Sequence, residues 1–279
     1  MIDLSLLWVA EWIVCAFFAY LLVLSQIFPL GGRSRLRVFA TGTVCVGGVV
    51  MLSQLRPSLA LQVARACLPV VYLLQGYWIC GLFMRQPVRR TEARLLDADR
   101  LLFRRTNLTA LLARGPRLVL GYFELTYLLV HPMVPGSLGL FFVVDGYARI
   151  DSFWTSVLLA GYGCYGLLPW IQTRPPRAIE HESYPAQERL LLRRLNLFVL
   201  RHGSVQINTL PSGHTSVAFA GALAVASVHT GLGVALLILA TSITVATVLG
   251  RYRYSVDAVA GVLVGIVSWW ISFHGLAPL

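Results

Sequence analysis

Thr215 to Gly250 reads TSVAFAGALAVASVHTGLGVALLILATSITVATVLG, a run of 36 residues without Asp, Glu, Lys or Arg. About 20 apolar residues are enough for one helix to cross a bilayer, so this run is too long for a single crossing. Its polarity rises at Ser227 to Gly233, and we expect two short helices that meet there. The stretch predicts a helical membrane protein.

The rest of the chain repeats this pattern. The 279 residues are 57% hydrophobic and 13% charged, with a mean hydropathy of +0.72. Soluble domains are about one quarter charged, so this composition excludes a soluble protein. Six further uncharged runs have spanning length: Trp12 to Leu30, Val38 to Leu55, Ala66 to Met84, Leu125 to Val144, Ser152 to Thr173 and Ala258 to Leu279. We expect an all-α, polytopic membrane bundle of about eight spans, with seven as the alternative count.

The charge of the chain is positive and unevenly placed. All 23 basic residues are arginine, against 12 acids, which gives a net charge of +11. With eight spans, most of the arginines fall in loops that share one face, chiefly within 33–37, 85–117 and 174–201. The positive-inside rule puts that face in the cytoplasm. Planar guanidinium groups suit phosphate or an anionic lipid surface.

Two segments next to the spans carry separate predictions. Between Thr91 and Arg105, apolar residues gather on one side at helical spacing and arginines flank them. We expect an interfacial helix on the lipid headgroups, with a solvated basic loop as the alternative. The N-terminal Met1-Ile2-Asp3 lacks the positive region of a signal peptide, so we expect the first apolar run to stay as an anchor.

Few reactive or charged groups lie within the apolar runs. The five cysteines all lie there, are odd in number and form no CxxC pair, which predicts buried free thiols. Glu11, Arg65 and Glu124 lie near the ends of runs. Charged groups in spans are functional candidates, but near a span end we favour snorkelling or inter-helix hydrogen bonds. No His, Cys, Asp or Glu cluster has ligand spacing, and we expect no metal and no other cofactor.

Two segments on the arginine-rich face suggest an anion site. Arg174-Pro175-Pro176-Arg177 follows the fifth span, where proline ends a helix and would hold two guanidinium groups at the membrane edge. Pro211-Ser212-Gly213-His214 opens the sixth span. There Ser212 is a helix N-cap, Gly213 allows close approach to the backbone, and first-turn amides face a bound anion. His214 is placed to protonate a leaving oxygen.

The third segment, Gly250 to Asp257, lies between the last two spans and reads GRYRYSVD. Asp257 follows Arg253 by four residues, so on a helical turn the two side chains would face each other and pair. Arg251 adds a further charge in the same segment.

In this order, the three segments resemble the motifs of the type 2 phosphatidic acid phosphatase family, a membrane branch of the vanadium haloperoxidase-like superfamily. The family pattern is Lys-x6-Arg-Pro, then Pro-Ser-Gly-His, then Ser-Arg-x5-His-x3-Asp, with a His-Tyr-x-x-Asp variant. The resemblance covers roughly Leu118 to Gly265 and implies a six-helix phosphatase-like core. It implies a histidine nucleophile that forms a phosphohistidine, with no metal required.

The resemblance assigns roles residue by residue. Arg174 binds phosphate, with Arg177 and Arg251 as further phosphate ligands. Ser212 and Gly213 cradle the phosphate, His214 protonates the leaving group, and Asp257 orients the nucleophile.

The chain departs from the family pattern at three places. Leu167 stands where the first motif has lysine, and Ala246 and Thr247 stand where the third has Ser-Arg. Arg253 stands where the third motif has its nucleophilic histidine. A guanidinium stays protonated and has no lone pair to attack phosphorus. His202 and His181 are alternatives for the missing nucleophile.

Three functions follow as hypotheses. The first is a lipid-phosphate phosphatase or phosphotransferase, impaired or rerouted at its nucleophile. The second is an inactive pseudophosphatase that serves as a phospholipid binder, sensor or scaffold. The third, a transporter or channel, needs broken helices or facing charges at mid-membrane, which the sequence does not clearly offer.

The remaining expectations concern organisation and setting. We expect N-terminal transmembrane helices over 1–84, a basic interfacial segment over 85–117 and a phosphatase-like core over 118–279. The expected partner is a phosphorylated or pyrophosphorylated membrane lipid, and no nucleic acid. We expect a bacterial-type plasma (inner) membrane. Family members usually work on the outer face, whereas the arginine loops put this site inside, so its side stays open.

Overall fold

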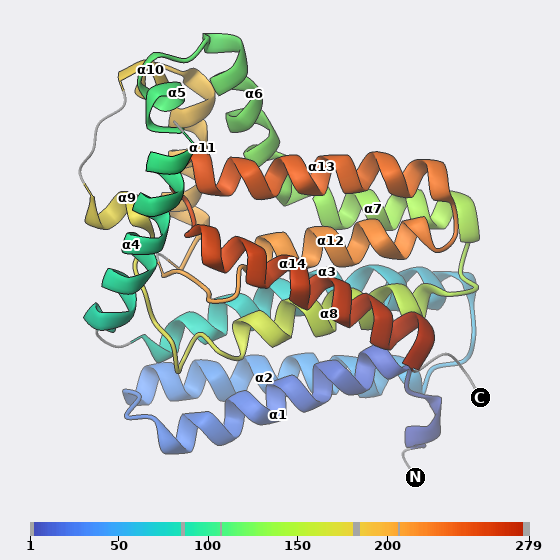
Figure 1. The fold of residues 1–279 in the computed structure, drawn as a ribbon. Helices are drawn as coiled ribbons and strands as arrows, with labels where there is room; N and C mark the ends of the chain where they lie inside the picture. The colour runs from blue at the N-terminus through green and yellow to red at the C-terminus, as the bar shows by residue number, and fades with distance from the viewer. Residues whose placement is uncertain (1–2, 85–86, 107, 181–184, 206, 276–279) are drawn as a thin grey trace.

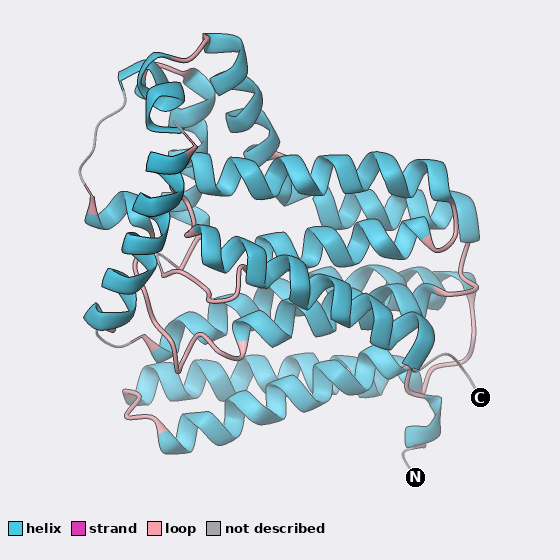
Figure 2. Ribbon diagram, viewed as in Figure 1, coloured by secondary structure: helices cyan, strands magenta, loops and turns pink. Residues whose placement is uncertain are grey.

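A computed structural model of the chain describes residues 3–84, 87–106, 108–180, 185–205 and 207–275. These residues form helices joined by loops (Figures 1 and 2). The α-helices are α1 (Val9–Ile27), α2 (Gly32–Ser53), α3 (Leu59–Cys80), α4 (Arg89–Arg105), α5 (Leu108–Arg114), α6 (Arg117–Leu128), α7 (Val130–Asp145), α8 (Ile150–Tyr165), α9 (Pro176–Ile179), α10 (Pro185–Glu188), α11 (Leu191–Gly203), α12 (Gly213–Ala226), α13 (Thr230–Leu249) and α14 (Ser255–Trp270). Short turns of other helix types lie at η1 (Leu4–Leu6), η2 (Gly81–Phe83) and η3 (Ile271–Gly275).

The long helices lie lengthwise beside one another as a bundle (Figure 1). Within the described ranges, five are long and apolar enough to cross a membrane, and the bent pair of α6 and α7 makes a sixth if it is one span. The all-helical, polytopic architecture is therefore confirmed. Helices α8 and α12 have 16 and 14 residues. Both are shorter than the roughly 20 residues of a full crossing, so the count of eight stays a prediction.

The uncharged run from Thr215 to Gly250 is divided as expected. Helix α12 ends at Ala226 and α13 begins at Thr230. His229 caps α13, because its Nδ1 accepts a hydrogen bond of 3.2 Å from the backbone N–H of Leu232.

Small residues let α14 approach α12 at the centre of the bundle. A Cβ at Gly261 would lie 2.6 Å from the carbonyl oxygen of Ser212, and one at Gly265 would lie 2.6 Å from that of Ser216. The backbones can approach this closely only because both glycines lack a side chain. The contact places the start of α12 against α14.

The uncharged run from Leu125 to Val144, which we expected to form one span, is bent in the structure. Helices α6 and α7 meet at Leu129 with a bend of 62°. Pro132 explains the break, because it has no N–H to donate to the carbonyl of Leu128 and its ring would clash with that carbonyl.

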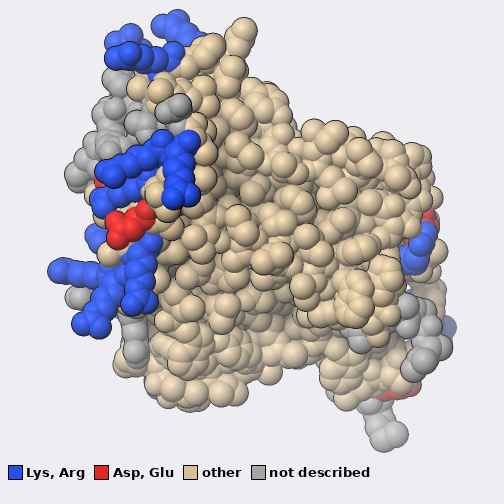
Figure 3. All heavy atoms as spheres, in the orientation of Figure 1, with Lys and Arg blue, Asp and Glu red and all other residues tan. Residues whose placement is uncertain are grey.

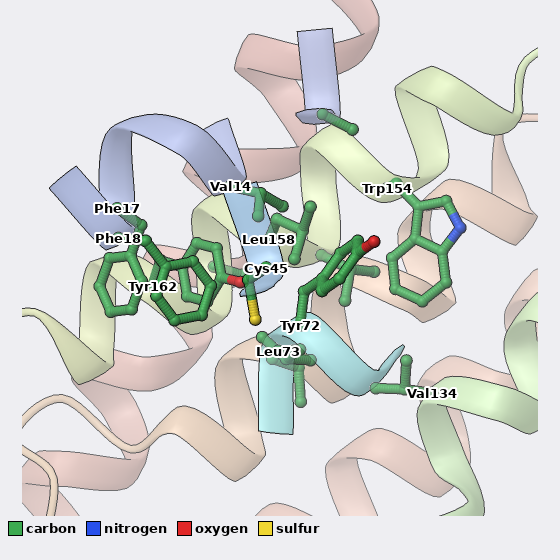
Figure 4. Packing of buried hydrophobic residues seen from close by; sticks show 14 of the residues in the cluster. Val14, Phe17, Phe18, Cys45, Tyr72, Leu73, Val134, Trp154, Leu158 and Tyr162 are labelled. Atoms are coloured by element: carbon green, nitrogen blue, oxygen red, sulfur yellow. The ribbon is translucent and has the colours of Figure 1, made fainter. Parts of the chain in front are cut away.

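Helices α1 and α3 pack against α8 through aromatic and aliphatic side chains, and α2 packs against α1 and α3 (Figure 4). The rings of Phe17 and Tyr162 stack with their centroids 3.8 Å apart. Glu11 and Arg65 form an ion pair, with 2.7 Å between Oε1 and Nε. The expected inter-helix hydrogen bonding of these two groups is confirmed. All five cysteines are free thiols, as predicted, but only Cys45, Cys80 and Cys164 are buried. The expected burial is wrong for Cys67, which is exposed, and Cys15 is half-buried.

The arginines gather at the end of the bundle where α4 and α9 lie (Figure 3). Helix α4 forms as expected, but its apolar side is buried against the protein instead of facing lipid headgroups. Leu95 and Leu96 pack with Tyr254. The backbone N–H of Ser255, the first residue of α14, donates to Asp99 Oδ1 at 2.8 Å. Helix α4 therefore caps the start of α14, where a carboxylate is favourable, and this contact fixes its inward face.

Candidate functional site

The three motif segments converge at the arginine-rich end of the bundle. The backbone N–H of Asn208 donates to the carbonyl of Thr173 at 2.8 Å, which joins the loop after α8 to the loop before α12. The N–H of Arg177 donates to the carbonyl of Arg251 at 3.3 Å, which joins the first motif to the third. The sequence separation between these segments is large, but the loops form one connected layer.

Arg253 is buried, with 5% of its surface exposed, and it contacts the loop before α12. Its Nη1 donates to Asn208 Oδ1 at 2.6 Å and to Thr209 Oγ1 at 2.9 Å. Its Nη2 lies 3.2 Å from Nδ1 of His214. Arginine has no acceptor, so His214 accepts this bond and a neutral ring carries its proton on Nε2. The pair presents guanidinium and imidazole N–H groups side by side.

Asn208 connects Arg253 to Asp257. Its Nδ2 donates to Asp257 Oδ2, while its Oδ1 accepts from Arg253. Asp257 is fully buried, and its Oδ1 has no hydrogen-bond partner among the described residues. The predicted helical pairing of Arg253 with Asp257 is wrong, because α14 begins only at Ser255 and Asn208 lies between the two side chains.

Ser212 and Gly213 form the first turn of α12. Ser212 is the N-cap, as predicted, and its Oγ accepts from the N–H of Thr215 at 3.4 Å. The N–H of Gly213 donates to Thr209 Oγ1 at 3.1 Å. A Cβ at Gly213 would lie 2.5 Å from the ring of Tyr165, so glycine accommodates that ring. Protein groups therefore already satisfy two of the amides that were expected to hold an anion.

Arg177 lies on the same layer as Arg253. Its Nη1 donates to the carbonyl of Tyr252 at 3.3 Å, and its guanidinium lies 5.4 Å from the centre of the Tyr252 ring. Arg193 approaches that ring to 4.7 Å. Burial lowers the pKa of Arg177, and the neighbouring charges of Arg253 and Arg193 lower it further. This part of the site thus concentrates positive charge around Tyr252 and His214.

Arg174 contacts a carboxylate outside this layer. Its Nε and Nη2 donate to Glu92 of α4 at 3.0 and 2.8 Å, and its backbone N–H adds a third bond at 2.8 Å. The hydrogen bond from Arg174 holds the pKa of Glu92 below its ordinary value, although partial burial opposes this. Arg174 therefore attaches the first motif to α4 in this structure.

Arg251 also has a carboxylate partner. It donates to Glu180, and its guanidinium lies 5.6 Å from the centre of the Phe103 ring. Its φ of 54° is in the left-handed region, at the turn that follows α13. Arg251 is thus directed toward α4 and α9.

The alternative histidine nucleophiles do not come together with Arg253 here. His202 lies near the end of α11, where its Nδ1 is 2.8 Å from the carbonyl oxygen of Phe198. His181 lies outside the described residues. His131, at the start of α7, is not among the predicted site residues, but it faces His214 with 6.1 Å between ring centroids. The only sequence signal was its position near a span end.

Glu124 is a second buried polar centre, which the sequence analysis expected to form inter-helix hydrogen bonds. It accepts from Gln187 at 2.8 Å, from Asn196 at 2.7 Å and from the hydroxyl of Tyr252 at 2.6 Å. Arg193 lies 3.4 Å away. Glu124 thus holds α6, α10, α11 and the third motif together, and that prediction is confirmed. The described residues contain no group of three or more His, Cys, Asp or Glu side chains placed to hold a metal.

This architecture defines a polytopic helical membrane protein with a buried polar cluster at one end. The chain belongs to the PAP2 superfamily, whose family model matches residues 93–271. No curated protein and no solved structure matches the chain significantly. The match begins within the segment 85–117 that the sequence analysis set apart, and it leaves α1 to α3 outside.

Proposed function

We propose that the protein binds the phosphate group of a membrane lipid at the arginine-rich end of the bundle without hydrolysing it. The contact between Arg253 and His214, 3.2 Å from Nη2 to Nδ1, carries this proposal. It groups a permanent positive charge with a neutral imidazole whose Nε2–H can donate to a phosphate oxygen. PAP2 proteins act on phosphate esters, often of lipids, which makes a lipid phosphate the natural ligand.

Charge balance supports an anion at this site. Among the described residues, Arg174, Arg193 and Arg251 each lie against a carboxylate. The hydrogen bonds of Arg177 go instead to backbone carbonyls. Arg253 reaches Asp257 only through Asn208. A buried charge without a compensating anion is costly, and a bound phosphate would compensate the buried guanidinium of Arg253 and the half-buried one of Arg177.

The same contact argues against turnover by the phosphohistidine route. Arginine at position 253 cannot attack phosphorus, because its guanidinium has no free lone pair. His214 accepts from Arg253 at Nδ1, and to become an imidazolium it would need a proton at that nitrogen. It is therefore suited to donate a hydrogen bond and poorly suited to act as a general acid.

A binding measurement tests this proposal. Purified protein in nanodiscs is titrated with phosphatidic acid, with Arg177→Gln and Arg253→Gln as test variants and Arg194→Gln as the control. Arg194 is an exposed neighbour of Arg193 on α11. We expect at least a tenfold loss of affinity in each test variant and a change under twofold in the control. Equal losses in all three would mean that general surface charge binds the lipid, and the proposed site would be wrong.

A second candidate function is hydrolysis or transfer of the phosphate group. The position of His131, which faces His214, supports it. A ring nitrogen of His131 would attack phosphorus, the bond from phosphorus to the lipid oxygen would break, and that oxygen would take a proton from water or His214. Water would then cleave the phosphohistidine and release phosphate. This candidate predicts phosphate release that His131→Ala abolishes, that His214→Ala slows and that the exposed His202→Ala retains. Absence of release from wild-type protein would remove it.

We also propose that the site faces the cytoplasm of a bacterial-type plasma membrane. The arginines of α4 and the neighbouring segments, away from the proposed phosphate contacts, support this orientation. A cysteine introduced as Arg94→Cys, in a background with Cys67→Ala because Cys67 is exposed, should react only with reagents that reach the cytoplasmic side. A cysteine introduced as Arg56→Cys, in the loop between α2 and α3, should react only from the other side. The reverse labelling would overturn the orientation.

A further inference from the structure

A cavity of about 210 Å³ lies between α3, α7, α8, α11 and α12, and His214 is one of its lining residues. His214 and His131 form its polar end. Leu74 and Leu200 belong to its apolar lining. His214 therefore belongs both to the lining of this cavity and to the proposed phosphate site.

The polar groups on the α3 and α11 wall of the cavity are engaged with one another. The hydroxyls of Tyr77 and Ser204 are 2.9 Å apart, and the N–H of Val205 donates to the Tyr77 hydroxyl at 3.0 Å. The indole N–H of Trp78 donates to the carbonyl of Gly203 at 3.0 Å. With these groups satisfied, the wall offers mostly hydrocarbon to an occupant. Cavities lined in this way favour apolar ligands over water.

The wall formed by α3 also borders the outside of the bundle. Leu74 and Trp78 line the cavity, and each keeps 45% of its surface exposed. A chain that occupies the cavity can therefore continue past these side chains into the bilayer. Helix α3 lies outside residues 93–271, so this wall is an addition to the part of the chain that matches the family.

We propose that this cavity holds a single hydrocarbon chain, the one next to the phosphate of the bound lipid. This inference rests on the proposed phosphate site. The volume supports one chain, because a 150 Å³ apolar cavity already accommodates one benzene ring, and two acyl chains need far more space. The ligand class is thus a lipid phosphate that places one chain beside His214 and His131.

An alkyl phosphate series tests the inference. Ethyl, butyl, hexyl and octyl phosphate are titrated against the protein in nanodiscs, together with inorganic phosphate. Each buried methylene is expected to tighten binding about fourfold until the cavity is full. Leu74→Trp fills the cavity from α3 and should flatten this dependence while leaving inorganic phosphate binding unchanged.

Val71→Trp is the matched control. Val71 lies on the same helix with 46% of its surface exposed, but it borders the groove between α2 and α3. It should keep the wild-type dependence on chain length. If Leu74→Trp behaves like Val71→Trp, or weakens inorganic phosphate to the same extent as octyl phosphate, the cavity is not the chain subsite. If wild-type protein binds neither inorganic phosphate nor any alkyl phosphate, the proposed phosphate site is wrong, and the inference of a chain subsite is then wrong as well.

Discussion

Nη2 of Arg253 lies 3.2 Å from Nδ1 of His214, so the guanidinium that we expect at the nucleophile position is hydrogen-bonded to the histidine of the Pro211-Ser212-Gly213-His214 segment. A histidine at position 253 would supply a lone pair, whereas arginine supplies only donors. The contact therefore favours holding a phosphate over attacking it. The proposed function therefore depends on the residue at position 253.

Asn208→Ala should destabilise the protein and weaken lipid-phosphate binding. Asn208 is 1% exposed and is hydrogen-bonded to both Arg253 and Asp257. Its removal leaves two buried groups without this partner, at about 1–3 kcal/mol for each unsatisfied group. Thermal unfolding and phosphatidic acid titration measure the two effects. The control is Gln54→Ala, which removes an exposed amide at the C-terminal end of α2. This variant should stay within about 0.5 kcal/mol of wild type. An unchanged Asn208→Ala protein would mean that Arg253 does not depend on this bridge.

Glu124→Ala should cost about 3–5 kcal/mol of unfolding free energy, because Arg193 would keep a buried charge without its carboxylate. Gln187, Asn196 and Tyr252 would each also lose an acceptor. Glu124→Gln keeps the shape and should cost less. The exposed Glu188→Ala is the control and should change stability little. Chemical denaturation in detergent gives these values, and equal effects of Glu124→Ala and Glu188→Ala would contradict the central role of Glu124.

Stability should fall in acid partly through Glu92. Arg174 lowers the pKa of this carboxyl in the folded protein, so the pair stabilises the fold above the ordinary glutamate pKa of about 4.3. That contribution is lost as pH falls through this value toward the lower folded-state pKa. Glu92→Gln should therefore be less stable at pH 6 and lose less stability between pH 6 and pH 3.

The matched control for this pH dependence is Asp97→Asn, on the same helix. Asp97 is largely exposed, with 71% of its side chain accessible, so its variant should follow the wild-type acid profile. Melting temperatures across the pH series provide the comparison. An identical decline in wild type and Glu92→Gln would show that the pair with Arg174 contributes nothing measurable.

The sequence predicted the bundle because crossing a bilayer demands long uncharged runs, and these are visible residue by residue. The break between α12 and α13 was predicted from the local rise in polarity at Ser227 to Gly233. The bend at Leu129 was missed although Pro132 signals it. The inward face of α4 was missed because the same apolar stripe suits either lipid or protein.

The site was harder to predict because its contacts join distant segments. The Pro211-Ser212-Gly213-His214 segment and Asp257 lie together in the structure, but neither motif reveals that Asn208 lies between Asp257 and Arg253. Arg174 was expected at a phosphate, yet its partner Glu92 lies 82 residues away in the chain. An arginine is available to a ligand only where no carboxylate already pairs with it. These carboxylates come from distant segments, so motif spacing alone does not predict them.

Release of phosphate from phosphatidic acid by purified protein in nanodiscs tests the central claim most directly. Wild type should release no more phosphate than His214→Ala, while both Arg253→His and wild type stay folded by thermal unfolding. Arg253→His restores a lone pair beside His214 and should gain release that the double variant with His214→Ala loses. Wild-type release well above the His214→Ala level would contradict the account, because the site would then turn over its lipid with arginine at position 253.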